Sequence, residues 1–149
     1  MLLHTTSEII SLAKKLENES AEFYEQISGQ YERDGAVFLS FSKENEKNVK
    51  QVERVYYGTI SDAIEGAFAF DLEKDKYSLD TGLDKNKGYP GMLEKVLSIE
   101  KLIIGFYSDA AGQSQSLMAD IPRVFKLLAR KRAERIEKLE SLLKSEAGS

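Results

Sequence analysis

The sequence predicts an all-α protein, a four-helix bundle made of two antiparallel helical hairpins joined by a long crossover. Three observations support this class. Four long segments carry apolar residues at the three- and four-residue spacing of an amphipathic helix. Short breaks separate the first two segments and the last two, whereas residues 58–91 separate the second from the third. The 149 residues include only two prolines, and 42% are hydrophobic and 31% charged, which fits a single helical domain over residues 1–149.

The first hairpin is predicted from residues 5–28 and 34–57. Thr5, with Glu8 three residues later, forms a capping-box pattern at the start of the first helix, and Gly29 is expected to end that helix. Gly58 is expected to end the second helix in the same way. The apolar faces consist of Ile9, Leu12, Ala13, Leu16, Ser20, Phe23, Tyr24 and Ile27 in the first helix, and of Phe38, Phe41, Val49, Val52 and Tyr56 in the second.

The second hairpin is predicted from a helix that begins after Pro90-Gly91 and another that begins around Asp120-Ile121-Pro122. Proline in the first turn is a typical start signal for a helix, because its missing N–H has no partner there in any case. The apolar faces consist of Met92, Val96, Ile99, Ile103, Phe106, Tyr107 and Ala110 in the third helix, and of Phe125, Leu128, Ile136, Leu139 and Leu143 in the fourth.

The crossover combines an apolar part with a polar tract over residues 71–88. The pattern leaves open whether residues 60–72 are helical or extended. Its large apolar side chains, Ile60, Ile64, Phe68 and Phe70, need to be covered either by the bundle or by a partner. A long connection at this point suits a bundle whose second hairpin re-enters after a crossover.

Composition excludes several classes of function. The chain has 21 basic and 25 acidic residues, a net charge of −4, which argues against general nucleic-acid binding. It has no cysteine, so disulfides, thiolate catalysis and iron–sulfur ligation are excluded, and its single histidine, His4, is expected to be a solvated terminal residue. No apolar run approaches the ~20 residues of a membrane span. Residues 1–4 lack the features of a signal peptide, so a cytoplasmic location is expected.

The two hairpins resemble each other in sequence. Leu16-Glu17 followed by Phe23-Tyr24 matches Ile99-Glu100 followed by Phe106-Tyr107, at an offset of 83 residues. In the second helix of each hairpin, an offset of 87 residues aligns one apolar stripe with the other, namely Phe38, Phe41, Val49 and Val52 with Phe125, Leu128, Ile136 and Leu139. The chain therefore contains an internal repeat, with four extra residues in the second hairpin that a loop can absorb.

Six charged or amide side chains are predicted to face the interior: Glu17, Asn45, Asn48, Glu100, Arg132 and Arg135. At about 100° per residue, Glu17 and Glu100 fall within about 50° of the centres of their apolar faces. Glu44 and Glu46 lie roughly 80° and 120° away from their stripe and are not expected to point inward. Because a buried carboxylate without a partner is costly, we expect the inward residues to pair with one another.

The repeated Glu followed seven residues later by Tyr, together with the long crossover, resembles the rubrerythrin-type domain of the ferritin-like superfamily. The resemblance spans residues 7–143 and is carried by Glu17, Tyr24, Glu100 and Tyr107. It implies a diiron fold in which each half supplies one Glu from its first helix and a Glu-x-x-His motif from its second. It also implies a homo-oligomer, commonly a dimer.

The Glu-x-x-His motif is present in neither half. The second helix reads Asn45-Glu46-Lys47-Asn48 at that place, and the fourth reads Arg132-Ala133-Glu134-Arg135. Glu17 and Glu100 are therefore the only family ligands retained, and both histidines are replaced. Read through this resemblance, the sequence predicts a degenerate metal site with no catalytic residue, no intact metal site and no cofactor.

The replaced residues suggest what stabilises the interior instead. Two Arg side chains balance the charge of two Glu side chains, and the guanidinium fork can bind a carboxylate bidentately. We expect Tyr24 and Tyr107 to be core residues with satisfied hydroxyls rather than redox-active groups. The expected function is that of a metal-free binding, scaffold or regulatory protein. Two alternatives stay open: a diiron-type oxidoreductase, peroxidase or ferroxidase that uses iron on the remaining carboxylates, and binding of a small anion by the Arg pair.

Overall fold

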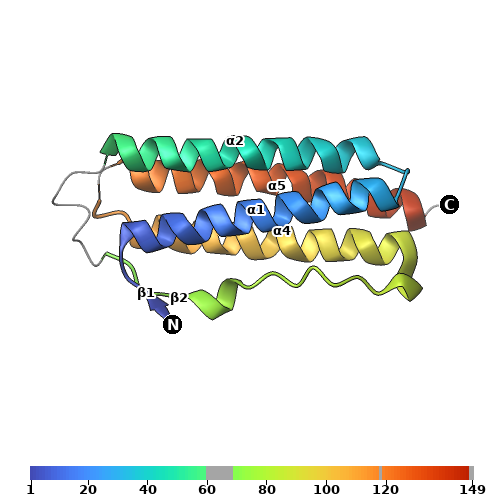
Figure 1. Cartoon of the computed structure of the whole chain (residues 1–149), viewed down its shortest axis with the longest axis horizontal. Helices are drawn as coiled ribbons and strands as arrows, with labels where there is room; N and C mark the ends of the chain where they lie inside the picture. Colours follow the sequence, from blue (N-terminus) through green and yellow to red (C-terminus); the bar gives the residue numbers. More distant parts are fainter. Residues whose placement is uncertain (60–68, 118, 148–149) are drawn as a thin grey trace.

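The computed structural model describes residues 1–59, 69–117 and 119–147. This part of the chain contains four long helices that lie side by side (Figure 1): α1 Thr6–Gln30, α2 Gly35–Thr59, α4 Gly88–Gln113 and α5 Asp120–Ala147. The prediction of an all-α protein is confirmed. None of these helices, among the described residues, is both long enough and apolar enough to cross a membrane.

The start of α1 follows its sequence signal. Thr5 is the N-cap residue, its hydroxyl oxygen accepts the Glu8 N–H at 3.1 Å, and the Glu8 carboxylate accepts the Thr5 N–H at 3.1 Å. The predicted end is wrong: α1 runs through Gly29 to Gln30, and the N–H of Tyr31 bonds the carbonyl of Ile27 at 2.9 Å. A glycine ends a helix by adopting a positive φ, and Gly29 does not do so.

One boundary each of α2 and α4 also differs from its prediction. Helix α2 continues past Gly58, which keeps a negative φ, so this predicted stop is also wrong. Helix α4 begins at Gly88 rather than after Pro90-Gly91, and Pro90 fits inside its first turn. The two positive φ angles in the described residues belong to Asp34 (58°) and Gly88 (62°), and each lies where a long helix begins. The start of α5 at Asp120, with proline in the first turn, is as predicted.

The helices form two hairpins. Helix α1 packs mainly against α2, and α4 packs mainly against α5. In Figure 1, α1 and α5 run in one direction and α2 and α4 in the other, so each hairpin is antiparallel. The second hairpin therefore begins at the opposite end of the bundle from the end of α2, and the chain between them must cover the length of the bundle.

The described part of the crossover runs along the bundle beside α4 (Figure 1). Strand β2 (Leu72–Glu73) pairs antiparallel with β1 (Leu2–Leu3), and the short 3₁₀ helices η1 (Lys74–Tyr77) and η2 (Lys85–Lys87) follow. Phe70 is 2% exposed, so the bundle covers it. Ile60, Ile64 and Phe68 lie outside the described residues. His4 is half-buried and its Nδ1 lies 3.2 Å from the Phe70 carbonyl oxygen, so it is not the solvated residue that we expected.

Candidate functional site: a buried ion network

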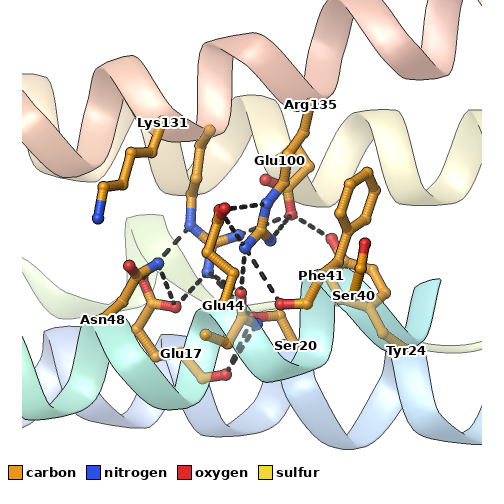
Figure 2. Close-up of polar contacts among 12 residues, drawn as sticks. Glu17, Ser20, Tyr24, Ser40, Phe41, Glu44, Asn48, Glu100, Lys131 and Arg135 are labelled. Atoms are coloured by element: carbon orange, nitrogen blue, oxygen red, sulfur yellow. Dashed lines mark hydrogen bonds and ion pairs between the residues drawn. The ribbon is translucent and has the colours of Figure 1, made fainter. Parts of the chain in front are cut away.

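All eight residues predicted for the centre of the bundle lie in its interior. Glu17 and Tyr24 come from α1, Asn45 and Asn48 from α2, Glu100 and Tyr107 from α4, and Arg132 and Arg135 from α5. Seven of these side chains are 0% exposed and Arg135 is 3% exposed. Figure 2 shows five of them, Glu17, Tyr24, Asn48, Glu100 and Arg135, with their polar groups pointing toward one another between the helices. We refer to these eight residues as the ion network.

Arg132 occupies the centre of the ion network. Its Nη2 and Nε donate to Glu17 Oε2 and Oε1 at 2.5 and 3.4 Å, a bidentate pair. Its Nη1 donates to Glu100 Oε2 at 2.6 Å. One guanidinium group therefore bridges the two carboxylates that the repeat places on opposite hairpins. Such charge-assisted bonds are the strong class of hydrogen bond in a protein interior.

The two tyrosines cross-link the hairpins in a reciprocal way. The Tyr24 hydroxyl on α1 donates to Glu100 Oε2 on α4, and the Tyr107 hydroxyl on α4 donates to Glu17 Oε1 on α1 at 2.6 Å. Each half of the repeat therefore supplies the phenol that satisfies the carboxylate of the other half. The hydroxyls are satisfied, as expected for tyrosines in a core.

Arg135 lies nearer the surface and has a different set of partners. It donates to Asn45 Oδ1 at 2.6 Å, to the Phe41 carbonyl at 3.2 Å and to Glu100 Oε2 at 3.4 Å. Its guanidinium also stacks over the Phe41 ring, 4.8 Å from the centroid. Its main ionic partner is Glu44, whose Oε1 accepts from Nη2 at 2.8 Å and from Nε at 3.1 Å.

Glu44 is the residue that the sequence reasoning missed. It is 40% exposed, in keeping with its position beside the apolar stripe, yet its carboxylate reaches sideways to Arg135 on the neighbouring helix. The prediction that Glu44 and Glu46 do not point inward agrees with the exposure of both side chains, but it did not include the ion pair between Glu44 and Arg135. The only available signal was its place one residue before Asn45, at the edge of the stripe.

The amide side chains complete the hydrogen bonding around Glu17. Asn45 Nδ2 donates to the Glu17 carbonyl at 3.1 Å and to Ser20 Oγ at 2.8 Å, while its Oδ1 accepts from both arginines. Asn48 Nδ2 lies 3.4 Å from each carboxylate oxygen of Glu17. Asn48 Oδ1 and Glu100 Oε1 are buried and have no hydrogen-bond partner among the described residues.

The charges of the ion network cancel. Burial alone would lower the pKa of the Arg132 guanidinium, but the nearby carboxylates of Glu100 and Glu17 outweigh it and raise that pKa well above its ordinary value. Burial, followed by the charge of Glu100, raises the pKa of Tyr24, and burial with the charge of Glu17 does the same for Tyr107. Counted as formal charges, two Glu side chains balance two Arg side chains, and the raised pKa values keep both phenols neutral at neutral pH.

These residues do not fit a pair of metal ions. Both oxygens of Glu17 and one oxygen of Glu100 accept hydrogen bonds from guanidinium groups, which cannot ligate a metal. Amides and guanidinium groups stand where the rubrerythrin pattern has carboxylates and imidazoles. Among the described residues, no group of three or more His, Cys, Asp or Glu side chains is placed to hold a metal ion. The donor set is that of an ion-paired interior.

Comparison of the chain with family models, with curated proteins and with solved structures gave no match.

Proposed function

We propose that this chain is a rubrerythrin-type, ferritin-like bundle in which an ion network has replaced the metal centre, and that it acts as a metal-free binding or scaffold protein. The observation that carries this proposal is the position of Arg132, whose guanidinium bonds Glu17 at 2.5 Å and Glu100 at 2.6 Å. These are the two positions at which the family pattern keeps its first-helix ligands. A cation built into the chain thus takes the place that a metal cation has in that pattern.

The arrangement of the helices supports the ferritin-like part of the proposal. Two antiparallel hairpins are joined by a connection that runs along the bundle, as in bundles with a long crossover (Figure 1). The repeat brings Glu17 and Glu100 onto one guanidinium and pairs each of them with the tyrosine of the other half. This reciprocal placement is what the duplication of an ancestral hairpin would produce.

Electrostatics supports the metal-free part of the proposal. Each guanidinium group a few ångströms away would repel a divalent ion by several kcal/mol even at an effective dielectric constant near 20, which offsets the attraction of the two carboxylates for that ion. It would also have to remove Glu17 from a bidentate ion pair that is 0% exposed on both sides. Breaking such a buried pair costs about 3–5 kcal/mol. Removing one partner from the ion network is therefore costly, and we place the functional contacts of the protein on its surface.

Iron addition tests the proposal directly. Purified protein is incubated with Fe²⁺ under anaerobic conditions and dialysed, and its iron is then measured by elemental analysis. We expect no retained iron and no peroxidase or ferroxidase activity. Two iron ions per chain, together with consumption of peroxide, would contradict the proposal and favour a diiron-type oxidoreductase.

A reverted variant tests the family interpretation separately. The quadruple variant restores the family pattern with Asn45→Glu, Asn48→His, Arg132→Glu and Arg135→His. We expect this variant to retain iron where the wild-type protein does not, because the helices that would carry the ligands already converge on one centre. A folded quadruple variant that retains no iron would show that the helices no longer hold the geometry of the family site or that the motif is aligned at the wrong residues, and it would leave the metal-free proposal standing.

A further inference from the structure

The carboxylate at the outer edge of the ion network is bound less firmly than the two at its centre. Glu44 pairs with Arg135 through a single oxygen, because Oε1 accepts from Nη2 at 2.8 Å and also from Nε at 3.1 Å. A bidentate pair would instead place one carboxylate oxygen on each N–H. The Glu44 side chain is 40% exposed, whereas the side chains of Glu17 and Glu100 are 0% exposed. Water therefore competes with Arg135 for the Glu44 carboxylate.

The guanidinium group of Arg135 is held in place by contacts other than Glu44. It donates to Asn45 Oδ1 at 2.6 Å and to the Phe41 carbonyl at 3.2 Å, and it stacks over the Phe41 ring. Its Nε, by contrast, has no hydrogen-bond partner in the described part of the chain other than Glu44. Figure 2 shows Nε and Nη2 turned toward Glu44, and we refer to these two groups as the guanidinium edge. Without Glu44, this edge would offer two fixed donors to another carboxylate.

Lysine side chains flank the guanidinium edge. Lys131 and Lys138 lie four residues before and three residues after Arg135, so they share its face of α5. Lys47 lies three residues after Glu44, on the same side of α2. Among the described residues, none of these three lysines makes an ion pair with a carboxylate. Their positive charges are therefore available to attract an anion toward the guanidinium edge.

We propose that the guanidinium edge binds a small anion that carries two or more carboxylates, and that Glu44 occupies the site when this anion is absent. One carboxylate of the ligand takes the place of the Glu44 carboxylate, with one oxygen on Nε and the other on Nη2 of Arg135. A second carboxylate reaches the ammonium groups of the flanking lysines, a contact that a monocarboxylate cannot make. This inference rests on the proposed function and deepens it, because it gives a metal-free binding protein a class of ligand.

Two features limit the affinity of this site. The Glu44 carboxylate is tethered beside the guanidinium edge, so its effective concentration there is high and every ligand competes with it. The exposed residues Glu46 on α2 and Glu134 on α5 add negative charge nearby. We therefore expect a dissociation constant on the order of 1 mM for citrate, and one about tenfold higher for acetate.

Titration of the metal-free, full-length protein with citrate tests the proposal. The Nε–H signal of Arg135 is followed by ¹⁵N NMR at constant ionic strength, and we expect it to shift until the site is saturated. Glu44→Ala removes the competing carboxylate and should tighten citrate binding about tenfold. Glu46→Ala removes the same charge from an exposed position two residues further along α2, and should change the affinity by less than about twofold.

A second pair of variants tests the contribution of the flanking lysines. Lys131→Gln should weaken citrate binding about threefold, and it should weaken acetate binding less. Lys101→Gln, at an exposed position on α4, removes the same charge away from the guanidinium edge and should leave both affinities unchanged. Equal weakening of citrate and acetate binding by Lys131→Gln would contradict a second carboxylate contact.

Three further results would overturn the proposal. One is a wild-type Arg135 signal that citrate does not shift, and another is a Glu44→Ala variant that binds citrate no more tightly than Glu46→Ala does. The third is binding of inorganic phosphate or of a short polyglutamate peptide about tenfold tighter than citrate, which would identify a different anion. Iron addition separates the two proposals, because protein that retains no iron and binds no citrate contradicts this inference alone. Protein that retains iron contradicts the proposed function, whatever its affinity for citrate.

Discussion

The two halves of the bundle place different chemistry at equivalent positions. In the first hairpin, the positions that face the centre from the second helix are Asn45 and Asn48, and in the second hairpin they are Arg132 and Arg135. Each half contributes one buried carboxylate, but both cations come from the second half. The difference teaches that charge is balanced in the assembled bundle and not within each hairpin: the first hairpin brings a net negative interior and the second a net positive one.

The largest effect is expected when Arg132 is replaced by asparagine, the residue at the equivalent position of the first hairpin. Arg132→Asn removes the guanidinium that bridges Glu17 and Glu100 and leaves two buried carboxylates without their main cation. We expect a loss of about 3–5 kcal/mol in the free energy of unfolding. Urea denaturation followed by circular dichroism measures it.

A control separates charge from packing in that variant. Adding Glu17→Gln and Glu100→Gln to Arg132→Asn removes the uncompensated charges while keeping the shapes of the side chains. The triple variant should recover part of the lost stability, because neutral amides cost less to bury than carboxylates. A single variant as stable as the wild-type protein would show that the carboxylates do not depend on Arg132.

Tyr24 and Tyr107 occupy equivalent positions of the repeat, so replacing each of them tests whether the two hairpins contribute equally to stability there. Tyr24→Phe and Tyr107→Phe each delete one hydroxyl that donates to a buried carboxylate of the other half. We expect each to cost about 1–2 kcal/mol near neutral pH, and the two costs to be similar. A large loss of stability for one variant and none for the other would show that the two equivalent hydrogen bonds contribute unequally to the free energy of unfolding.

Alkaline pH sharpens the same test. The ordinary pKa of tyrosine is about 10, and in the folded protein the pKa values of Tyr24 and Tyr107 are raised well above it by burial and by Glu100 and Glu17. Above pH ~10 the unfolded chain therefore loses protons that the folded chain keeps. Stability that is fully present below that pH falls as pH rises further, by about 1.4 kcal/mol per pH unit for each group. Unfolding titrations from pH 7 to 11 should show a shallower fall in the Tyr24→Phe/Tyr107→Phe variant than in the wild-type protein.

The smallest effect is expected at the edge of the ion network. Glu44→Gln removes the charge that faces Arg135, but the carboxylate is 40% exposed and an amide oxygen can still accept from the guanidinium. We expect a loss of no more than about 1 kcal/mol, in keeping with solvent-screened pairs. Glu46→Gln, two residues further along α2 at an exposed position, serves as the matched control. A loss as large as that of Arg132→Asn would mean that Glu44 carries a central share of the charge balance.

Much of the site was predictable because it depends on which face of a helix a residue occupies. The apolar periodicity located four helices, and the repeat aligned Glu17 with Glu100 and Asn45 with Arg132, all of which are buried. Glu44 was missed because an angular position describes where the side chain begins, whereas a long side chain can cross to a neighbouring helix. Arg135 is its partner only because α2 and α5 are neighbours, and no single-helix pattern contains that information.

The helix ends were less predictable for a different reason. Gly29 and Gly58 permit a stop but do not impose one, and each is still helical, with its helix ending one residue later, at Gln30 and at Thr59. Asp34, by contrast, takes the positive φ that glycine usually supplies, and its carboxylate accepts a hydrogen bond from Tyr89 on the other hairpin. The pairing of β1 with β2 involves two residues on each strand, which is too short to leave any alternating pattern in the sequence.

The location of both cations on α5 has a consequence for how the chain folds. During synthesis the first hairpin, with Glu17 on its inner face, is complete long before the arginines emerge. The Glu17 carboxylate has no cationic partner until α5 docks. Burying this carboxylate among the earlier helices alone would therefore be costly. We therefore expect docking of α5 to complete the assembly, and a truncated chain that lacks α5 to keep water around the Glu17 carboxylate.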